Sequence, residues 1–138
     1  MTTQEFQAYL EAKAGVPLSA LGIEANSLRL LALDDRSASL RLGLARARAA
    51  FVAVVDGGLP VLLAQALAYA VTKTAVPLAR VAESAVSMKE HVPLRSGSLW
   101  VEALLTESTA PDERWYSIDI IDDRDARVSS GQCRVKLG

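Results

Sequence analysis

Residues 57–71 constrain the fold of this chain most, because nearly all of them are apolar. The segment 56–60, Asp-Gly-Gly-Leu-Pro, predicts a helix start, since aspartate caps helices and proline is tolerated in the first turn. The helix is expected to run to about Thr74, with Pro77 beyond it. A helix that is apolar on every side must be buried on every side. In a chain of 138 residues, only a sheet that curls around the helix can bury it in this way.

Strand-like segments flank this helix on both sides in the sequence. The segment 37–44 has apolar residues at every second position, which is the period of a strand with one buried face. The residues Asp34, Asp35 and Arg36 before it predict a hairpin turn. The order of elements indicates an α+β fold with a largely antiparallel sheet. The expected strands are 28–33, 37–44, 81–92, 98–107, 114–121 and 126–137.

A short helix precedes the first strand. Thr2 and Glu5 have the spacing of a capping box, in which each side chain bonds the backbone of the other residue. Gly15 and Pro17 are expected to end the helix. We therefore expect one domain over residues 1–138, in which 1–20 form an N-terminal helix and a turn.

Composition excludes several classes of function. The net charge is −1 and the basic residues are scattered, so no nucleic-acid partner is expected. One cysteine and one histidine are too few for a structural metal site, and no cofactor is expected apart from coenzyme A carried by a substrate. The N-terminus lacks the features of a secretory signal, and the apolar run after Pro60 is too short to span a bilayer. A soluble cytoplasmic protein without a membrane partner is the expectation.

Three polar side chains interrupt the apolar helix. Gln65, Tyr69 and Thr72 are four and three positions apart, which places them on one face. A polar stripe on a buried helix needs partners, because an unpaired buried amide costs about 1–3 kcal/mol. The partner of Gln65 is either a ligand or water, or a second subunit across an interface. Tyr69 and Thr72 either line the same pocket or belong to the edge of the core.

Four motifs, taken in order, resemble those of hotdog-fold thioesterases of the phenylacetate-pathway and 4-hydroxybenzoyl-CoA type. They are Leu-Gly-Ile at 21–23, Gly-Gly at 57–58, Val-Pro-Leu-Arg-Ser-Gly at 92–97, and the acidic turn 122–128 with Gly131. The resemblance covers about residues 20–137. It implies a hotdog fold, in which a six-stranded antiparallel sheet wraps around the long helix. It also implies a homodimer or homotetramer with an acyl-CoA site at the subunit interface.

The sequence departs from this family at two polar positions. The family commonly has His-Gly-Gly at the helix start and an Asp or Glu nine positions after the histidine, whereas this chain has Asp56 and Gln65. A backbone N–H of Gly57 or Gly58 can still polarise the thioester carbonyl, because helix N-termini favour developing negative charge. Glutamine is neither a base nor a nucleophile, so the family's usual mechanism does not carry over intact.

Four other side chains are candidates for the site. Asp56 is either a displaced base or simply the helix cap. His91 is either a base or an exposed histidine at a strand end, and Glu90 is a carboxylate beside it. Arg95 either meets the phosphates of coenzyme A or is a solvated surface charge.

Two hypotheses of function follow. The first is an acyl-CoA thioesterase, in which Asp56, Gln65, Glu90 or His91 contributes to activating water. The second is a noncatalytic hotdog module that binds an acyl-CoA or only mediates oligomerisation, and Gln65 favours it. A hotdog dehydratase would need a histidine facing a carboxylate, and the sequence shows no clear pair. Trp100 shares one face of its strand with Leu104 while other apolar residues occupy the opposite face, which predicts burial against another subunit.

Overall fold

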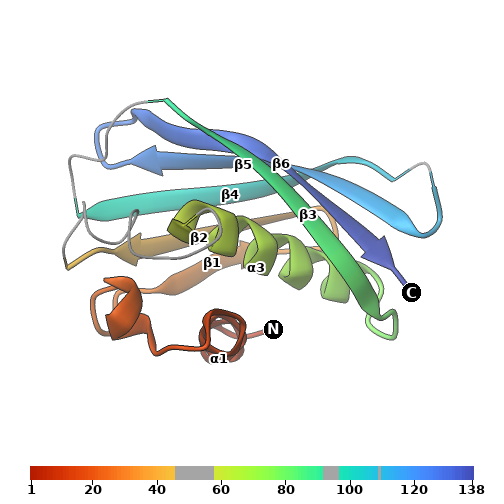
Figure 1. Cartoon of the computed structure of the whole chain (residues 1–138), viewed down its shortest axis with the longest axis horizontal. Helices are drawn as coiled ribbons and strands as arrows, with labels where there is room; N and C mark the ends of the chain where they lie inside the picture. Colours follow the sequence, from red (N-terminus) through yellow and green to blue (C-terminus); the bar gives the residue numbers. More distant parts are fainter. Residues whose placement is uncertain (46–57, 92–96, 109) are drawn as a thin grey trace.

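The computed structural model describes residues 1–45, 58–91, 97–108 and 110–138. A six-stranded antiparallel sheet curves around the long helix α3 (Gly58–Ala75), as Figure 1 shows. The order of strands in the sheet is β1-β2-β4-β5-β6-β3. This architecture confirms the predicted α+β hotdog fold. The strands are β1 (Arg29–Leu33), β2 (Ser37–Gly43), β3 (Val81–Glu90), β4 (Ser98–Glu107), β5 (Glu113–Asp122) and β6 (Arg127–Leu137).

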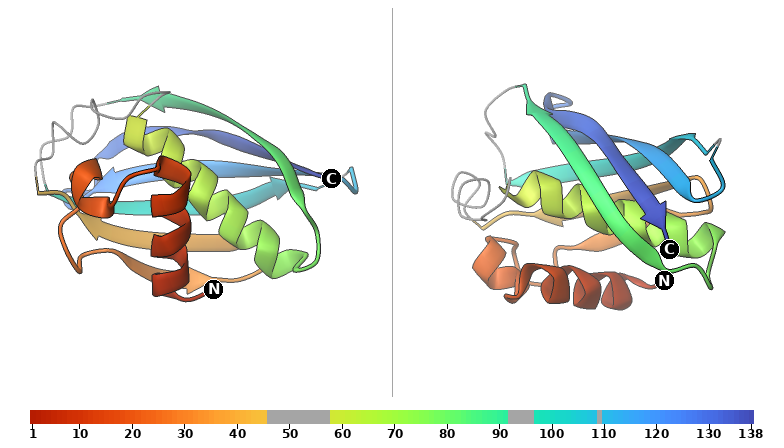
Figure 2. Two further views of the ribbon diagram at one scale, coloured as in Figure 1. Left: turned by 60° about the horizontal axis from the view of Figure 1, so that its bottom comes forward. Right: turned by 45° about the vertical axis from the view of Figure 1, so that its right-hand side comes forward.

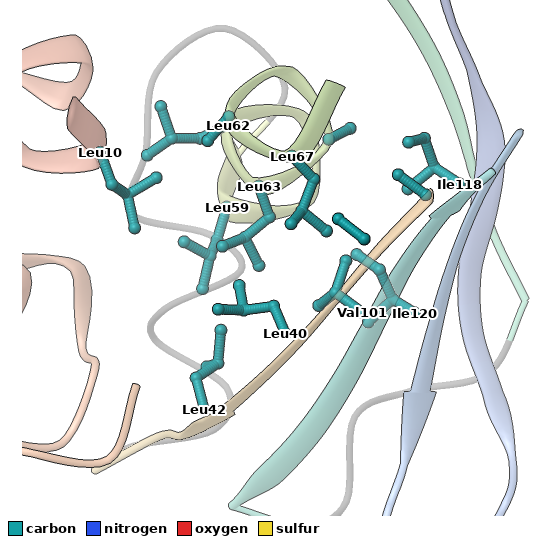
Figure 3. Packing of buried hydrophobic residues seen from close by; sticks show 14 of the residues in the cluster. Leu10, Leu40, Leu42, Leu59, Leu62, Leu63, Leu67, Val101, Ile118 and Ile120 are labelled. Atoms are coloured by element: carbon teal, nitrogen blue, oxygen red, sulfur yellow. The ribbon is translucent and has the colours of Figure 1, made fainter. Parts of the chain in front are cut away.

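Helix α3 lies across the concave face of the sheet and forms the centre of the core. Leu59, Leu63 and Leu67 are fully buried, and Figure 3 shows them facing side chains of β2, β4 and β5. The facing side chains include Leu40 and Val101, which are also fully buried. The helix was predicted to be buried on every side; in the structure most of its residues are buried, but Val61, Gln65, Tyr69 and Lys73 form a half-buried stripe.

The N-terminal helix α1 (Thr3–Ala14) packs against α3 and the edge strand β1 (Figure 2). The predicted capping box is present: the Glu5 amide donates to the Thr2 hydroxyl and the Thr2 amide donates to the Glu5 carboxylate. Gly15 ends the helix in the left-handed conformation, with φ 73°. A short 3-10 helix, η1 (Leu18–Leu21), then leads toward β1.

The hairpin between β1 and β2 turns at the predicted residues. The Asp34 carboxylate accepts hydrogen bonds from the backbone amides of Arg36 and Ser37, at 2.8 Å each. These bonds hold the pKa of the Asp34 carboxyl below its usual value. The aspartate side chain therefore provides the local reason for the turn.

Strand β3 is an edge of the sheet and pairs with β6 alone. The two strands approach closely at Gly131, where a Cβ atom would lie 1.9 Å from the carbonyl oxygen of Ser87. Only glycine fits at this position without moving β3. The other backbone edge of β3 has no pairing strand among the described residues.

The outer face of the sheet, turned away from α3, carries exposed apolar side chains. Trp100 is 38% exposed and Leu104 is 52% exposed, whereas Leu99 and Val101 on the opposite face of β4 are buried. The predicted division of β4 into two apolar faces is confirmed. Within the described ranges, no helix is long and apolar enough to cross a membrane, and no cluster of three or more His, Cys, Asp or Glu could hold a metal ion.

Candidate functional site

A pocket of about 410 Å³ opens between α1, α3 and the start of β3. Its floor is apolar where Val81 and Val135 line it. Polar and aromatic side chains from the three elements surround that floor. They include Tyr9 and Lys13 from α1, Gln65 and Tyr69 from α3, and Glu83 and Ser84 from β3.

Most polar groups at this pocket lack a hydrogen-bonding partner in the part of the chain that the structure describes. No such bond is recorded for the amide of Gln65 or for the hydroxyls of Tyr9, Tyr69 and Ser84. These side chains are half-buried, and no fully buried side-chain nitrogen or oxygen atom among the described residues lacks a partner. The polar groups of this pocket are therefore reached by solvent and are available to a ligand, to water or to a second chain.

Thr72 lies on the same face of α3 as Tyr69 in the sequence pattern, but it does not line the pocket. It is fully buried, and its hydroxyl donates to the carbonyl of Ala68 at 2.7 Å. The hydroxyl also bonds the phenol oxygen of Tyr116 on β5 at 2.8 Å. Of the two roles expected for Thr72, the structure shows the core role.

Glu90 and His91 lie at the far end of β3 from the pocket. From Ser84 to Glu90 the strand rises by about 20 Å at the usual 3.3 Å per residue. The alternation of the strand directs Glu90 to the same face as Ser84. The His91 ring instead bonds the hydroxyl of Ser130 on β6, which places it toward the outer face. The structure therefore separates these two candidates from each other and from Gln65.

The N-terminal end of α3 is the remaining part of the predicted site. Gly58 is buried with φ 77°, so its backbone has a conformation that favours glycine. The amides of the first helical turn have no acceptor within the helix and carry its positive dipole end. Asp56, Gly57 and Arg95 lie outside the described residues, so their predicted roles stay predictions.

Two groups beside the pocket have raised pKa values. Burial, and then the proximity of Tyr69 and Cys133, raises the pKa of Tyr9 to about 12. Burial raises the pKa of the Cys133 thiol to about 12, against a smaller opposing effect of Lys13. Both groups are therefore protonated and uncharged near neutral pH.

A second cavity, of about 450 Å³, lies on the outer face of the sheet. Three of its polar side chains have structural roles: the Trp100 indole donates to the Glu102 carboxylate, and Asp122 accepts from two backbone amides of the β5–β6 turn. None of the predicted site residues that the structure describes lines it. The pocket at Gln65 is the better candidate, although it is slightly smaller.

Four polar residues of the candidate site, Tyr9, Lys13, Glu83 and Ser84, were not predicted as site residues from the sequence. Tyr9 and Lys13 belong to the predicted N-terminal helix, and no local pattern reveals that this helix contacts α3. Ser84 and Ser87 occupy opposite faces of β3, and the structure shows that Ser84 is the one at the pocket. Strand alternation was the signal for Ser84, but it could not tell which face was inward.

Comparison with known proteins supports the fold. No protein-family model matches the sequence, and no curated protein does. Thioesterase superfamily member 2 of zebrafish superimposes with a TM-score of 0.73 at 11% identity, covering 100% of this chain and 99% of that one. The PaaI protein of the E. coli phenylacetic acid degradation operon gives 0.60 at 16% identity, covering 97% of each chain. A Streptococcus mutans protein bound to acetyl CoA gives 0.66 at 9% identity, over 83% of this chain and 91% of that one.

The chain therefore has the hotdog fold, which it shares with these solved structures. The resemblance inferred from four short motifs is confirmed at the level of the fold, and the phenylacetate-operon protein is among the similar structures.

Proposed function

We propose that this chain binds an acyl-CoA thioester in the pocket between α1, α3 and β3 and hydrolyses it. The observation that carries the proposal is the unpartnered amide of Gln65 at the pocket, on a helix that is otherwise apolar and buried. The fold supports this class of ligand, because it is shared with solved thioesterases and with a protein bound to acetyl CoA.

Hydrolysis joins a water oxygen to the thioester carbonyl carbon, breaks the carbon–sulfur bond and releases a carboxylic acid and the thiol of coenzyme A. Negative charge develops on the carbonyl oxygen during this step. The free amides at the start of α3, beginning at Gly58, are suited to stabilise that charge. Gln65 can orient water or the ligand by hydrogen bonds, but it cannot take up the proton of the water. Of the predicted bases, Glu90 and His91 lie far from this pocket within one chain, and Asp56 lies outside the described residues.

Geometry favours a site that is shared by two subunits. Gly58 and Gln65 are seven residues apart on one helix, which is about 10 Å along its axis. A single thioester group is too small to contact both within one chain. A homodimer across the free edge of β3 would bring the helix start of one subunit toward the Gln65 of its partner. The exposed apolar outer face supports further pairing of dimers into a tetramer.

A second candidate function is a noncatalytic module that binds acyl-CoA. Gln65 favours it, because an amide stands where the family has a carboxylate. Within the described residues, Glu83 is the only carboxylate that lines the pocket, and it is paired with Arg134 at 3.0 Å. Such a pair makes Glu83 a poor base.

Release of free thiol from a panel of acyl-CoAs, with short, long and aromatic acyl groups, tests the proposal. Hydrolysis well above background for one class of acyl group establishes a thioesterase. Absence of hydrolysis across the panel, together with saturable binding of an acyl-CoA in calorimetry, supports the noncatalytic module. If the purified oligomer neither hydrolyses nor binds any acyl-CoA of the panel, both functions are contradicted.

The substitution Gln65→Glu tests whether this position holds the catalytic group. A carboxylate there should create or raise hydrolysis by on the order of 100-fold, which is the size of a general-base contribution. Gln132→Glu is the matched control, because Gln132 is exposed on β6. Equal rates for the two folded variants would argue against a catalytic role at position 65.

A further inference from the structure

The N-terminal helix supplies one wall of the pocket through an aromatic stack. The rings of Tyr9 on α1 and Tyr69 on α3 lie parallel, with their centroids 4.0 Å apart and an interplanar angle of 4°. Both rings line the pocket beside Gln65. Parallel aromatic rings at this distance form a close contact with little space between them.

Several contacts hold α1 in place, so this wall is fixed relative to α3. Phe6 and Leu10 on α1 are fully buried in the core. The Thr3 hydroxyl accepts a hydrogen bond from the backbone amide of Leu30 on β1, at 3.1 Å. Tyr9 is therefore positioned by a docked helix and not by a free terminus.

The stack lies farther along α3 than Gln65, away from the helix start. Tyr69 follows Gln65 by four residues, which is about 6 Å along the axis. An acyl group that runs from a thioester at Gln65 toward the C-terminal end of α3 therefore meets the two rings. Val81 and Val135 give the same pocket an apolar surface.

We propose that the stacked pair of Tyr9 and Tyr69 closes the acyl end of the pocket and that α1 thereby sets the longest acyl group accepted. This inference rests on the proposed function and assigns its substrate class: compact acyl groups, short or with a single ring, in preference to long unbranched chains. Tyr9 is a specificity-determining residue in this scheme.

The size and charge of the pocket agree with this class. Its volume of about 410 Å³ lies near the lower end of the range for small-molecule sites, about 300–1,000 Å³. The phenol of Tyr9 is uncharged at physiological pH, so its ring places no charge against an apolar acyl group, while Lys13 and Glu83 also line the pocket.

A series of S-alkyl-CoA thioethers with two to about twelve alkyl carbons measures the length limit directly, because they are not hydrolysed. Calorimetry on the full-length protein should show binding that strengthens by roughly fourfold per buried methylene and then stops improving at a defined length. Tyr9→Ala should move this limit to longer chains, and Tyr9→Trp should move it to shorter ones. Tyr9→Phe and Gln4→Ala, a change on the exposed side of α1, should leave it in place.

Tyr9→Ala and Tyr9→Trp change the side-chain size in opposite directions, so one of them still tests the inference if the other disturbs α1. Circular dichroism verifies that each variant is folded, and the Trp variant retains an aromatic ring to pack on Tyr69. If wild-type protein binds no member of the series, the proposed function fails and the inference fails with it. If wild type binds but has no length limit, or has the same limit in the Ala and Trp variants, only the inference is overturned.

Discussion

The buried hydroxyl pair of Thr72 and Tyr116 gives a quantitative test of how α3 is tied to the sheet. The single hydroxyl hydrogen of Thr72 is donated to the carbonyl of Ala68, so the Tyr116 phenol must donate to Thr72. The phenol oxygen in turn accepts from the Arg114 guanidinium at 2.7 Å. Arg114 also bonds the carbonyl of Asp35, so the network joins α3, β5 and the β1–β2 turn.

Each single substitution should destabilise the fold by a different route. Tyr116→Phe removes a neutral and a charge-assisted hydrogen bond, but Thr72 keeps its bond to Ala68 and the half-buried Arg114 can be hydrated. We expect a loss of about 1–2 kcal/mol in the free energy of unfolding. Thr72→Val keeps the side-chain shape and leaves the buried phenol hydrogen without an acceptor, which should cost about 1–3 kcal/mol.

The double variant should lose less than the sum of the two single variants, because it leaves no phenol hydrogen unpaired. We expect a coupling of about 1 kcal/mol between Thr72 and Tyr116. Urea unfolding at one protein concentration measures it, since oligomerisation makes stability depend on concentration. Tyr69→Phe is the matched control and should change stability by less than about 0.5 kcal/mol. Additivity within about 0.5 kcal/mol would refute the assigned hydrogen-bond directions.

Three further predictions concern reactivity, pH and assembly. Because burial raises the pKa of Cys133 to about 12, a thiol reagent at neutral pH should label native protein far more slowly than protein unfolded in urea, and equal rates would contradict the burial. The pKa of Tyr9 is raised from 10.0 to about 12 in the folded state, so on raising the pH the unfolded chain loses the phenol proton before the folded protein does. The free energy of unfolding should therefore be constant below pH 10 and fall between pH 10 and 12. Denaturation at each pH measures this fall, which should be less steep in Tyr9→Phe. Leu104→Glu on the outer face should halve the mass of a tetramer in sedimentation while leaving the fold intact, and an unchanged mass would exclude this face as an interface.

Local patterns were sufficient to predict most of the fold. The apolar run of α3 and the alternation in β2 and β4 are properties of consecutive residues, and the structure follows them closely. The capping box of Thr2 and Glu5 is likewise a contact between near neighbours. Such features depend on helix and strand periodicity alone, so they can be inferred before any tertiary contact is known.

The site was harder to predict because it depends on contacts between distant segments. The helical pattern placed Tyr69 and Thr72 on one face and could not distinguish their roles. In the structure, Tyr116 of β5 covers Thr72, whereas Tyr69 is left beside the pocket and packs on Tyr9. The way that α1 docks on α3 decides this difference. The polarity of Gln65 on an apolar helix singled it out, and the structure places it at the pocket, where its role stays a prediction.

The strand order has a consequence for how the protein is made. Among the described strands, β3, which lines the pocket, pairs only with β6, and β6 follows the other five strands in the sequence. During translation, β3 must remain without its neighbour while β4 and β5 are added, so completion of the pocket is a late event in folding. Loss of residues 127–137 would leave β3 without a strand to pair with. Damage to β6 would thereby weaken a binding pocket that α1, α3 and β3 also line.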